Sequence, residues 1–145
     1  MPITYRLRSD EKLVILVHRG IVTDEEFLSF YRTIYEDNRF DKSFDLLVDL
    51  RQTESASRSA EALSEFAEFI RNHFSNTSAG PKVAVVAPKD ISFGLARMYE
   101  ALSGDVPVEF AVFRTSDEAL SRLGMSENLI DDLDGEPRPE NSPGL

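Results

Sequence analysis

Asp49 and Arg51 are the side chains whose types and position could support chemistry. They end the apolar run FDLLVDLR at residues 44–51, which is typical of a strand buried inside a parallel sheet. Open α/β sheets bind ligands and partners beyond the carboxyl ends of such strands. Two residues apart in a strand, Asp49 and Arg51 share one face, so they could hold a polar ligand or a metal, or bond to each other and cap nearby backbone. We expect a site, if one exists, at this strand end and at the polar loop of residues 52–59.

Other patterns that carry chemistry are absent from the sequence. The two histidines, His18 and His73, lie far apart and lack the spacing of a metal pair, so we expect structural roles for them. The chain has no cysteine, which excludes disulfides, thiolate zinc sites and cysteine nucleophiles. It has no nucleophile elbow, no dinucleotide fingerprint and no phosphate-binding loop of the Walker type. We therefore predict a protein without cofactor or metal that is not an enzyme; a cleft joining Asp49 and Arg51 with Arg97 or Arg114 is the enzymatic alternative.

Composition points to one soluble domain with an acidic tail. The chain has 145 residues and a formal net charge of −10, so phosphate backbones and anionic membrane surfaces are not expected partners. The N-terminus lacks the apolar core of a signal peptide, and no apolar run reaches membrane-spanning length, so we expect a cytoplasmic protein. We predict a domain over residues 1–126. Residues 127–145, rich in Gly, Pro and acids, are predicted to form a disordered tail.

Strands and helices alternate along the chain. The expected strands are short apolar or alternating runs at residues 3–7, 12–18, 44–51, 82–87 and 108–113. Helix starts are indicated by capping boxes at Thr23 and Thr115, by a possible cap at Ser59, and by Asp90 after a proline. The order β-β-α-β-α-β-α-β-α predicts a mixed, mostly parallel five-stranded sheet with an antiparallel edge hairpin and helices packed on it. Residues 44–51 and 82–87 should be neighbouring parallel strands.

Helical spacing predicts the apolar face of each of the first three helices. These faces are Phe27, Phe30, Tyr31, Ile34 and Tyr35; then Leu63, Phe66, Ala67, Ile70 and Phe74; then Ile91, Leu95, Met98, Tyr99 and Leu102. The aromatic residues exceed what a thin core needs, and Phe69 lies off the main stripe of its helix. Buried core is the first interpretation. The alternative is that part of this surface is exposed and forms an interface or a ligand groove. For an exposed patch of this kind, we favour homodimerisation.

Three stretches carry a resemblance to a known family. They are LLVDLR at 46–51, KVAVVAPKDISFGLARMYEAL at 82–102, and VFRTSDEALSRLG at 112–124. Together with the element order, they resemble the STAS domain, the SpoIIAA-like fold of bacterial anti-sigma factor antagonists, and more closely the group described as STAS/SEC14 domain-containing. The resemblance covers residues 1–125. It implies a single SpoIIAA-like domain with a regulatory or protein-binding role, and, for the SEC14-like relatives, binding of an apolar ligand.

A serine at the start of the second helix is the switch in phospho-regulated STAS proteins, within an Asp-Ser-Ser-Gly motif. In the matching register this chain has Ser57-Arg58-Ser59-Ala60, so only Ser59 agrees with the motif. A phosphate on Ser59 would lie at a helix N-terminus, where Arg58 could pair with it. The alternative is that Ser59 is an ordinary N-cap.

Two functional hypotheses follow. In the first, the domain binds another protein or a second copy of itself through the surface around the loop 52–59 and the adjacent helix. Asp49, Arg51, Ser57 and Ser59 are the candidate interaction or switch residues. In the second, it carries a small apolar or lipid-like ligand between its helices and its sheet. The candidate residues for that ligand, or for an interface, are Phe66, Phe69, Met98 and Tyr99.

Overall fold

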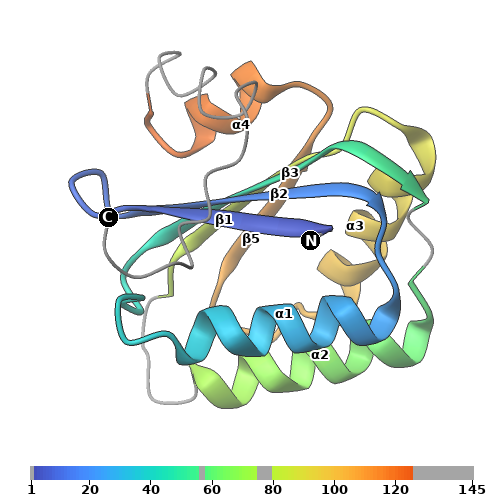
Figure 1. Cartoon of the computed structure of the whole chain (residues 1–145), viewed down its shortest axis with the longest axis horizontal. Coiled ribbons are helices and arrows are strands. Elements are labelled where there is room, and N and C mark those ends of the chain that lie inside the picture. The colour runs from blue at the N-terminus through green and yellow to red at the C-terminus, as the bar shows by residue number, and fades with distance from the viewer. Residues whose placement is uncertain (1, 56–57, 75–79, 126–145) are drawn as a thin grey trace.

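The computed structural model describes residues 2–55, 58–74 and 80–125 as one layered α/β fold (Figure 1). Its strands are β1 (Ile3–Arg8), β2 (Leu13–Ile21), β3 (Asp45–Ser55), β4 (Lys82–Val86) and β5 (Glu109–Phe113). Its helices are α1 (Asp24–Glu36), α2 (Ala60–His73), α3 (Asp90–Leu102) and α4 (Ser116–Arg122). The predicted element order is confirmed. The predicted tail at residues 127–145 lies outside the described residues.

The sheet has five strands in the spatial order β1-β2-β3-β4-β5. β1 pairs antiparallel with β2, while the β2–β3, β3–β4 and β4–β5 pairs are parallel. Leu46 lies opposite Val83 in the β3–β4 pair. The predictions of an antiparallel edge hairpin and of neighbouring parallel strands at 44–51 and 82–87 are therefore confirmed.

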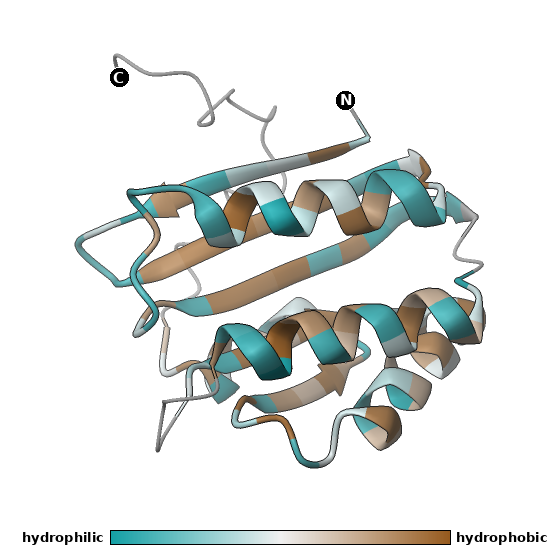
Figure 2. Cartoon of the chain, turned by 90° about the horizontal axis from the view of Figure 1, so that it is seen from below, coloured by the Kyte–Doolittle hydropathy of each residue, from teal (hydrophilic) through white to brown (hydrophobic). Residues whose placement is uncertain are grey.

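Each face of the sheet has its own hydrophobic core. Leu46 and Val48 of β3 belong to the core under α1, α2 and α3, whereas Leu47 between them belongs to the core under α4. This alternation follows from the two-residue period of a strand, and it explains why the central strands are apolar along most of their length (Figure 2). Figure 1 shows α4 alone on its face, with α1 and α2 on the opposite one.

Side-chain caps fix where the helices begin. The Thr23 hydroxyl accepts a hydrogen bond from the Glu26 amide at 3.1 Å, and the Glu26 carboxylate accepts one from the Thr23 amide at 3.0 Å. The predicted capping box of α1 is thus complete. At α4, Thr115 accepts from the Glu118 amide at 3.3 Å but donates its hydroxyl proton to the Glu118 carboxylate at 2.9 Å. Both arrangements satisfy amides that a helix start leaves without intrahelical partners.

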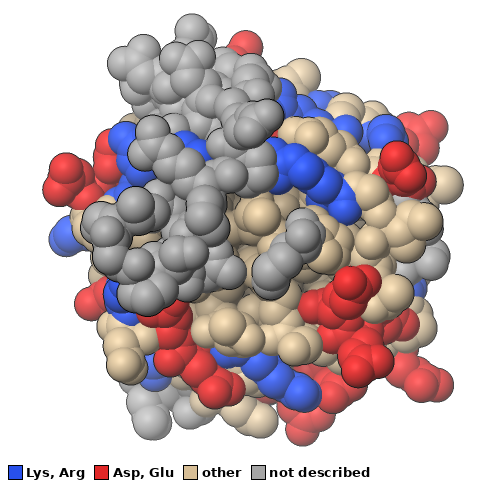
Figure 3. Space-filling view, viewed as in Figure 1, with Lys and Arg blue, Asp and Glu red and all other residues tan. Residues whose placement is uncertain are grey.

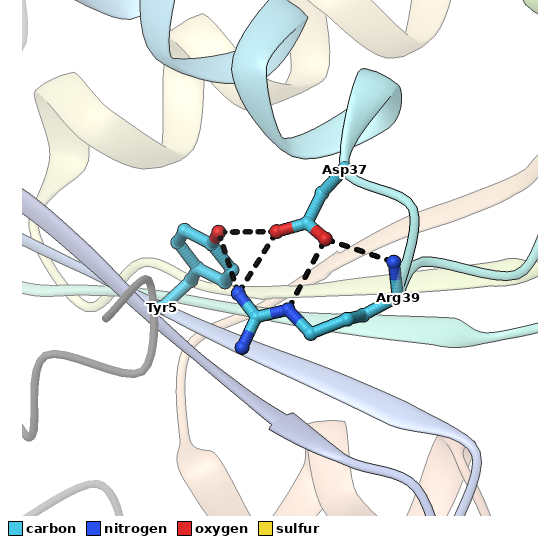
Figure 4. A network of polar contacts seen from close by, with 3 residues as sticks. All are labelled: Tyr5, Asp37 and Arg39. Atoms are coloured by element: carbon cyan, nitrogen blue, oxygen red, sulfur yellow. Dashed lines mark hydrogen bonds and ion pairs between the residues drawn. The ribbon is translucent and has the colours of Figure 1, made fainter. Parts of the chain in front are cut away.

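A polar cluster ties the end of α1 to the edge strand β1 (Figure 4). Asp37, the C-terminal cap of α1, accepts hydrogen bonds from the Tyr5 hydroxyl at 2.7 Å and from two side-chain nitrogens of Arg39 at 2.9 and 3.1 Å. The Arg39 hydrogen bonds hold the pKa of Asp37 well below its usual range. These contacts give the cluster a structural role, because they fix the connection between α1 and β3.

The predicted inner face of α3 is correct for Leu95 and Tyr99, which pack against the core, and wrong for Ile91, Met98 and Leu102. Ser92, Ala96 and Tyr99 face the core, while Ile91, Met98 and Leu102 are 71%, 45% and 41% exposed. The small side chains at positions 92 and 96 let the helix approach the sheet closely, and this contact turns the larger apolar residues away from it. The strand at residues 44–51 is also longer than predicted, because β3 continues to Ser55.

Candidate functional site

A cavity of about 120 Å³ lies between the sheet and helices α1, α2 and α3. Most of its wall is apolar, and each of the surrounding elements contributes to it. Representative residues of this wall are Phe27 of α1, Val48 of β3, Phe66 of α2, Val85 of β4, Leu95 of α3 and Phe110 of β5. Folded interiors contain few voids larger than a water molecule, so a cavity of this size is a feature that needs explaining.

Three polar side chains form what we call the polar end of the cavity: His18, Arg58 and Ser92. His18 is near the end of β2, Arg58 follows β3 and precedes α2, and Ser92 is in the first turn of α3. All three come from the edge of the sheet where its parallel strands finish, which is where α/β sheets commonly bind ligands. The cavity therefore combines an apolar body with one polar end, as small-molecule sites do.

His18 and Tyr31 form a buried neutral pair at this end. The His18 Nε2 atom lies 3.1 Å from the Tyr31 hydroxyl, and both residues are buried. Burial, reinforced by the charge of Arg58, lowers the pKa of His18 to about 3. Burial also raises the pKa of Tyr31 far above its usual value. At neutral pH both side chains are therefore uncharged.

Arg58 brings a positive charge to the same end. Only 9% of its side chain is exposed, its Nη1 atom contacts the Asp24 carboxylate at 3.0 Å, and its guanidinium carbon lies 5.3 Å from the centre of the Phe27 ring. Burial lowers the pKa of the Arg58 guanidinium, and Asp24 and Glu26 oppose this shift. The guanidinium is thus a largely buried cation beside one directly bonded carboxylate.

Acidic side chains surround the starts of α1 and α2 outside the cavity. They are Asp24, Glu25 and Glu26 in the first turn of α1 and Glu61 in the first turn of α2. Figure 3 shows acidic side chains gathered on this part of the surface, at the lower right of the view. These groups suit the positive ends of the two helix dipoles, and they place a negative rim around Arg58.

Asp49 and Arg51 lie on the other face of the sheet from the cavity. Asp49 has the same parity in β3 as Leu47, and its neighbours in the sheet are Val17 and Val86, which belong to the core under α4. Its side chain is fully buried, and its carboxylate accepts hydrogen bonds from the Arg51 amide, Nε and Nη2 at 2.9, 3.0 and 3.1 Å. The geometry matches the alternative in which the two residues bond to each other.

Ser59 is the N-cap of α2. Its hydroxyl accepts a hydrogen bond from the Ala62 amide at 3.0 Å, which is the ordinary role of a serine at this position. The neighbouring candidate Ser57 lies outside the described residues. Phosphorylation of Ser59 stays a prediction.

The four apolar candidates separate into two groups. Phe66 and Tyr99 are buried and line the cavity, with their ring centres 5.2 Å apart. Phe69 is half-buried against Tyr35 of α1, and Met98 is exposed on α3, so neither residue lines the cavity.

No pattern in the sequence predicts that His18, Arg58 and Ser92 meet, because three separate elements supply them.

The described part of the chain contains neither a metal-binding cluster nor a membrane-spanning helix. Among these residues, no group of three or more His, Cys, Asp or Glu side chains is arranged to hold a metal ion. Within the same ranges, every helix is too short or too polar to cross a membrane.

Comparison with known proteins identifies the fold. No protein-family model and no curated protein matches the chain. Among solved structures, it is similar to an uncharacterized protein of the DUF3478 family with a SpoIIAA-like fold from Shewanella loihica PV-4. The two share 16% sequence identity, the match covers 83% of this chain and 91% of the other, and the TM-score is 0.53. The chain therefore has a SpoIIAA-like fold, as the sequence resemblance predicts, and at this identity the similarity extends to the fold alone.

Proposed function

We propose that this protein is a non-enzymatic binding domain that takes up a small apolar or amphipathic molecule between its sheet and helices α1 to α3. The observation that carries this proposal is the 120 Å³ cavity. Its wall is mostly apolar, so a ligand that fills it would remove apolar surface from water and stabilise the folded state.

Size restricts the ligand to a small molecule. An engineered protein cavity of about 150 Å³ lined by apolar residues binds benzene, and the cavity here has about 120 Å³. A single aromatic ring or a short alkyl chain fits this space, whereas a whole membrane lipid requires the helices to move apart.

The polar end of the cavity supports binding better than catalysis. A general base works best when its pKa is near the operating pH, but the pKa of His18 is about 3 and its Nε2 atom contacts Tyr31. The described structure does not support the enzymatic alternative, a cleft that joins Asp49 and Arg51 with Arg97 or Arg114. Asp49 is buried on the other face of the sheet, Arg97 contacts Glu100 and Arg114 contacts Asp90. These contacts support a non-enzymatic role.

Filling the cavity should abolish ligand binding without unfolding the protein. Leu95 of α3 lines the cavity and is half-buried, so Leu95→Phe extends an aromatic ring into the empty space. We expect benzene to raise the melting temperature of the wild type and to have no effect on Leu95→Phe, which should remain folded.

The matched control is Met98→Leu, because Met98 is an exposed residue of the same helix. Benzene should stabilise this variant as much as the wild type. Native mass spectrometry of the gently purified protein provides an independent reading, since a retained ligand adds its mass. A wild type that neither responds to benzene nor carries a ligand would refute the proposal.

A second candidate function, association with another chain, is favoured by the edge strand β5. This strand pairs with β4, and its sequence EFAVF carries one charge and no proline. The opposite edge, β1, carries Arg6 and Arg8. Charged residues protect an edge from pairing with other chains, whereas an apolar edge strand promotes such pairing. This surface differs from the loop 52–59 that the sequence favours.

Backbone geometry makes a second copy a suitable partner for β5. The Glu109 amide and the Phe113 carbonyl bond toward the β4 side, to Pro81 and Ala87, so the backbone groups of Phe110 and Val112 point away from it. In an antiparallel pair centred on Ala111, each Phe110 lies opposite Val112 of the other copy. Aromatic and β-branched residues are a favourable cross-strand pair.

A charge at the centre of β5 should prevent this association. Ala111→Lys places two like charges opposite each other at the twofold axis, and we expect it to convert a wild-type dimer to a monomer in sedimentation velocity. Ala101→Lys, at an exposed position of α3, is the matched control and should remain dimeric. A strictly monomeric wild type would rule out self-association through β5.

A further inference from the structure

Arg58 has hydrogen-bonding capacity that its contacts leave unused. A guanidinium carries five N–H donors, and within the described ranges the carboxylate it contacts, that of Asp24, engages Nη1 alone. The Asp24 side chain is 40% exposed, so this partner is itself shared with solvent. The side chain of Arg58, only 9% exposed, forms part of the cavity wall. Arg58 is thus a largely buried cation that borders the cavity and has donors that these contacts do not use.

Neighbouring groups at the polar end are also suited to an acceptor. The Ser92 hydroxyl is buried, and its contact with Thr53 is long, at 3.4 Å, so it is available as a donor to a closer acceptor. Tyr31 and His18 are neutral at neutral pH and add no negative charge inside the cavity. The remaining wall is apolar. A ligand that matches these features has an anionic, acceptor-only head and an apolar body.

We infer that the cavity binds a small carboxylic acid, either aromatic or short-chain, whose carboxylate contacts Arg58 and Ser92 and whose apolar part lies between Phe66, Tyr99 and the sheet. A carboxylate offers the planar pair of acceptors that a guanidinium binds bidentately. The volume of about 120 Å³ suits one ring or a short chain. This inference rests on the proposed function and specifies its ligand class.

The negative rim has a consequence for binding rates. Asp24, Glu25, Glu26 and Glu61 lie in the first turns of α1 and α2 and repel an anion that approaches this end of the protein. Salt screens exposed charges over roughly 8 to 10 Å near physiological ionic strength, so added salt should speed the association of a carboxylate. The association of a neutral analogue should respond much less.

Benzoate and benzamide test the inference, because they are nearly isosteric and differ in charge. We expect the wild-type protein to bind benzoate about tenfold to a hundredfold more tightly than benzamide in calorimetric titrations, since hydrogen bonds to charged groups contribute about 1.5–3 kcal/mol. Arg58→Met should remove this preference while leaving the affinity for benzamide within about threefold of the wild-type value. Arg58→Lys should keep part of the preference for benzoate.

Arg32→Met is the matched control, because Arg32 makes an exposed ion pair with Glu65 on the helix surface and its loss changes the net charge equally. It should keep the full preference for benzoate. Equal affinity for benzoate and benzamide in the wild type, or an unchanged preference in Arg58→Met, would overturn the inference while leaving the proposed function intact. If neither compound nor benzene binds the wild type, the proposed function itself fails. The wild-type comparison does not depend on any variant being folded.

Discussion

Asp49→Ala is expected to lower the free energy of unfolding by about 2 to 4 kcal/mol. Removing one partner of a buried ion pair is costly because the other charge loses its compensation. Here the Asp49 carboxylate is fully buried and accepts three hydrogen bonds from Arg51, one of them from the backbone. We place the effect below the upper end of the range for buried pairs because 26% of the Arg51 side chain is exposed and can be rehydrated.

The matched control for Asp49→Ala is Asp105→Ala. Asp105 also forms a two-bond pair with an arginine, Arg71, but the two side chains are 67% and 39% exposed. Exposed pairs contribute about 0–1 kcal/mol, so urea unfolding should separate the two variants clearly. Equal loss of stability in both would contradict the structural role of Asp49.

Asp49→Ala also distinguishes the two faces of the sheet. The residue lies in the core under α4, and the cavity lies under α1 to α3. We therefore expect the folded variant to bind benzene as the wild type does. Weakened binding would indicate that the strand end around Asp49 and Arg51 is part of the site, as the sequence suggests.

Strand pattern was sufficient to predict the sheet. The run at residues 82–87 has apolar side chains on both of its faces, and the structure places Val83 and Ala84 in different cores. A strand of this kind must lie inside the sheet with helices on both sides. Strand and helix alternation then restricts the topology to a small number of arrangements.

Helix rotation was less accessible from the sequence. α3 carries apolar residues over a wide arc, so periodicity alone does not determine which part of the arc meets the sheet. The contact is made through Ser92 and Ala96, whose small size matters more than their hydropathy, and Met98 is left exposed. In α2, by contrast, the predicted face is confirmed: Phe66 lies on it and lines the cavity, whereas Phe69, predicted to lie off it, packs beside α1.

The polar end of the cavity is a tertiary property. His18, Arg58 and Ser92 are separated by 40 and 34 residues in the sequence, and no local motif connects them. Their common feature is position, since each lies at the carboxyl edge of the parallel strands. The rule that ligands bind at this edge indicates the correct region, but it selects Asp49 and Arg51, whose side chains point to the opposite face.

Acid is expected to destabilise the protein through His18. The imidazole has a pKa of about 3 in the folded state and about 6.5 in the unfolded chain. Between these values the unfolded state binds a proton that the folded state does not. The contribution of the neutral His18 to the free energy of unfolding is therefore fully present above pH 6.5. It falls by about 1.4 kcal/mol per pH unit as the pH decreases below that value. By pH 3 the loss is about 4 to 5 kcal/mol, which is comparable to the whole stability of many domains.

His18→Gln should flatten this dependence, because glutamine can still bond to the Tyr31 hydroxyl but does not titrate. Urea unfolding between pH 6.5 and 4.5 at constant ionic strength measures the slope, and this range avoids most of the effect of Asp37, whose stabilising contribution is lost at lower pH. His73→Gln is the control, since His73 is only partly buried and burial lowers its pKa less severely. A slope in His18→Gln as steep as in the wild type would show that His18 becomes protonated in the folded protein. The polar end of the cavity would then carry a second positive charge in acid, beside that of Arg58.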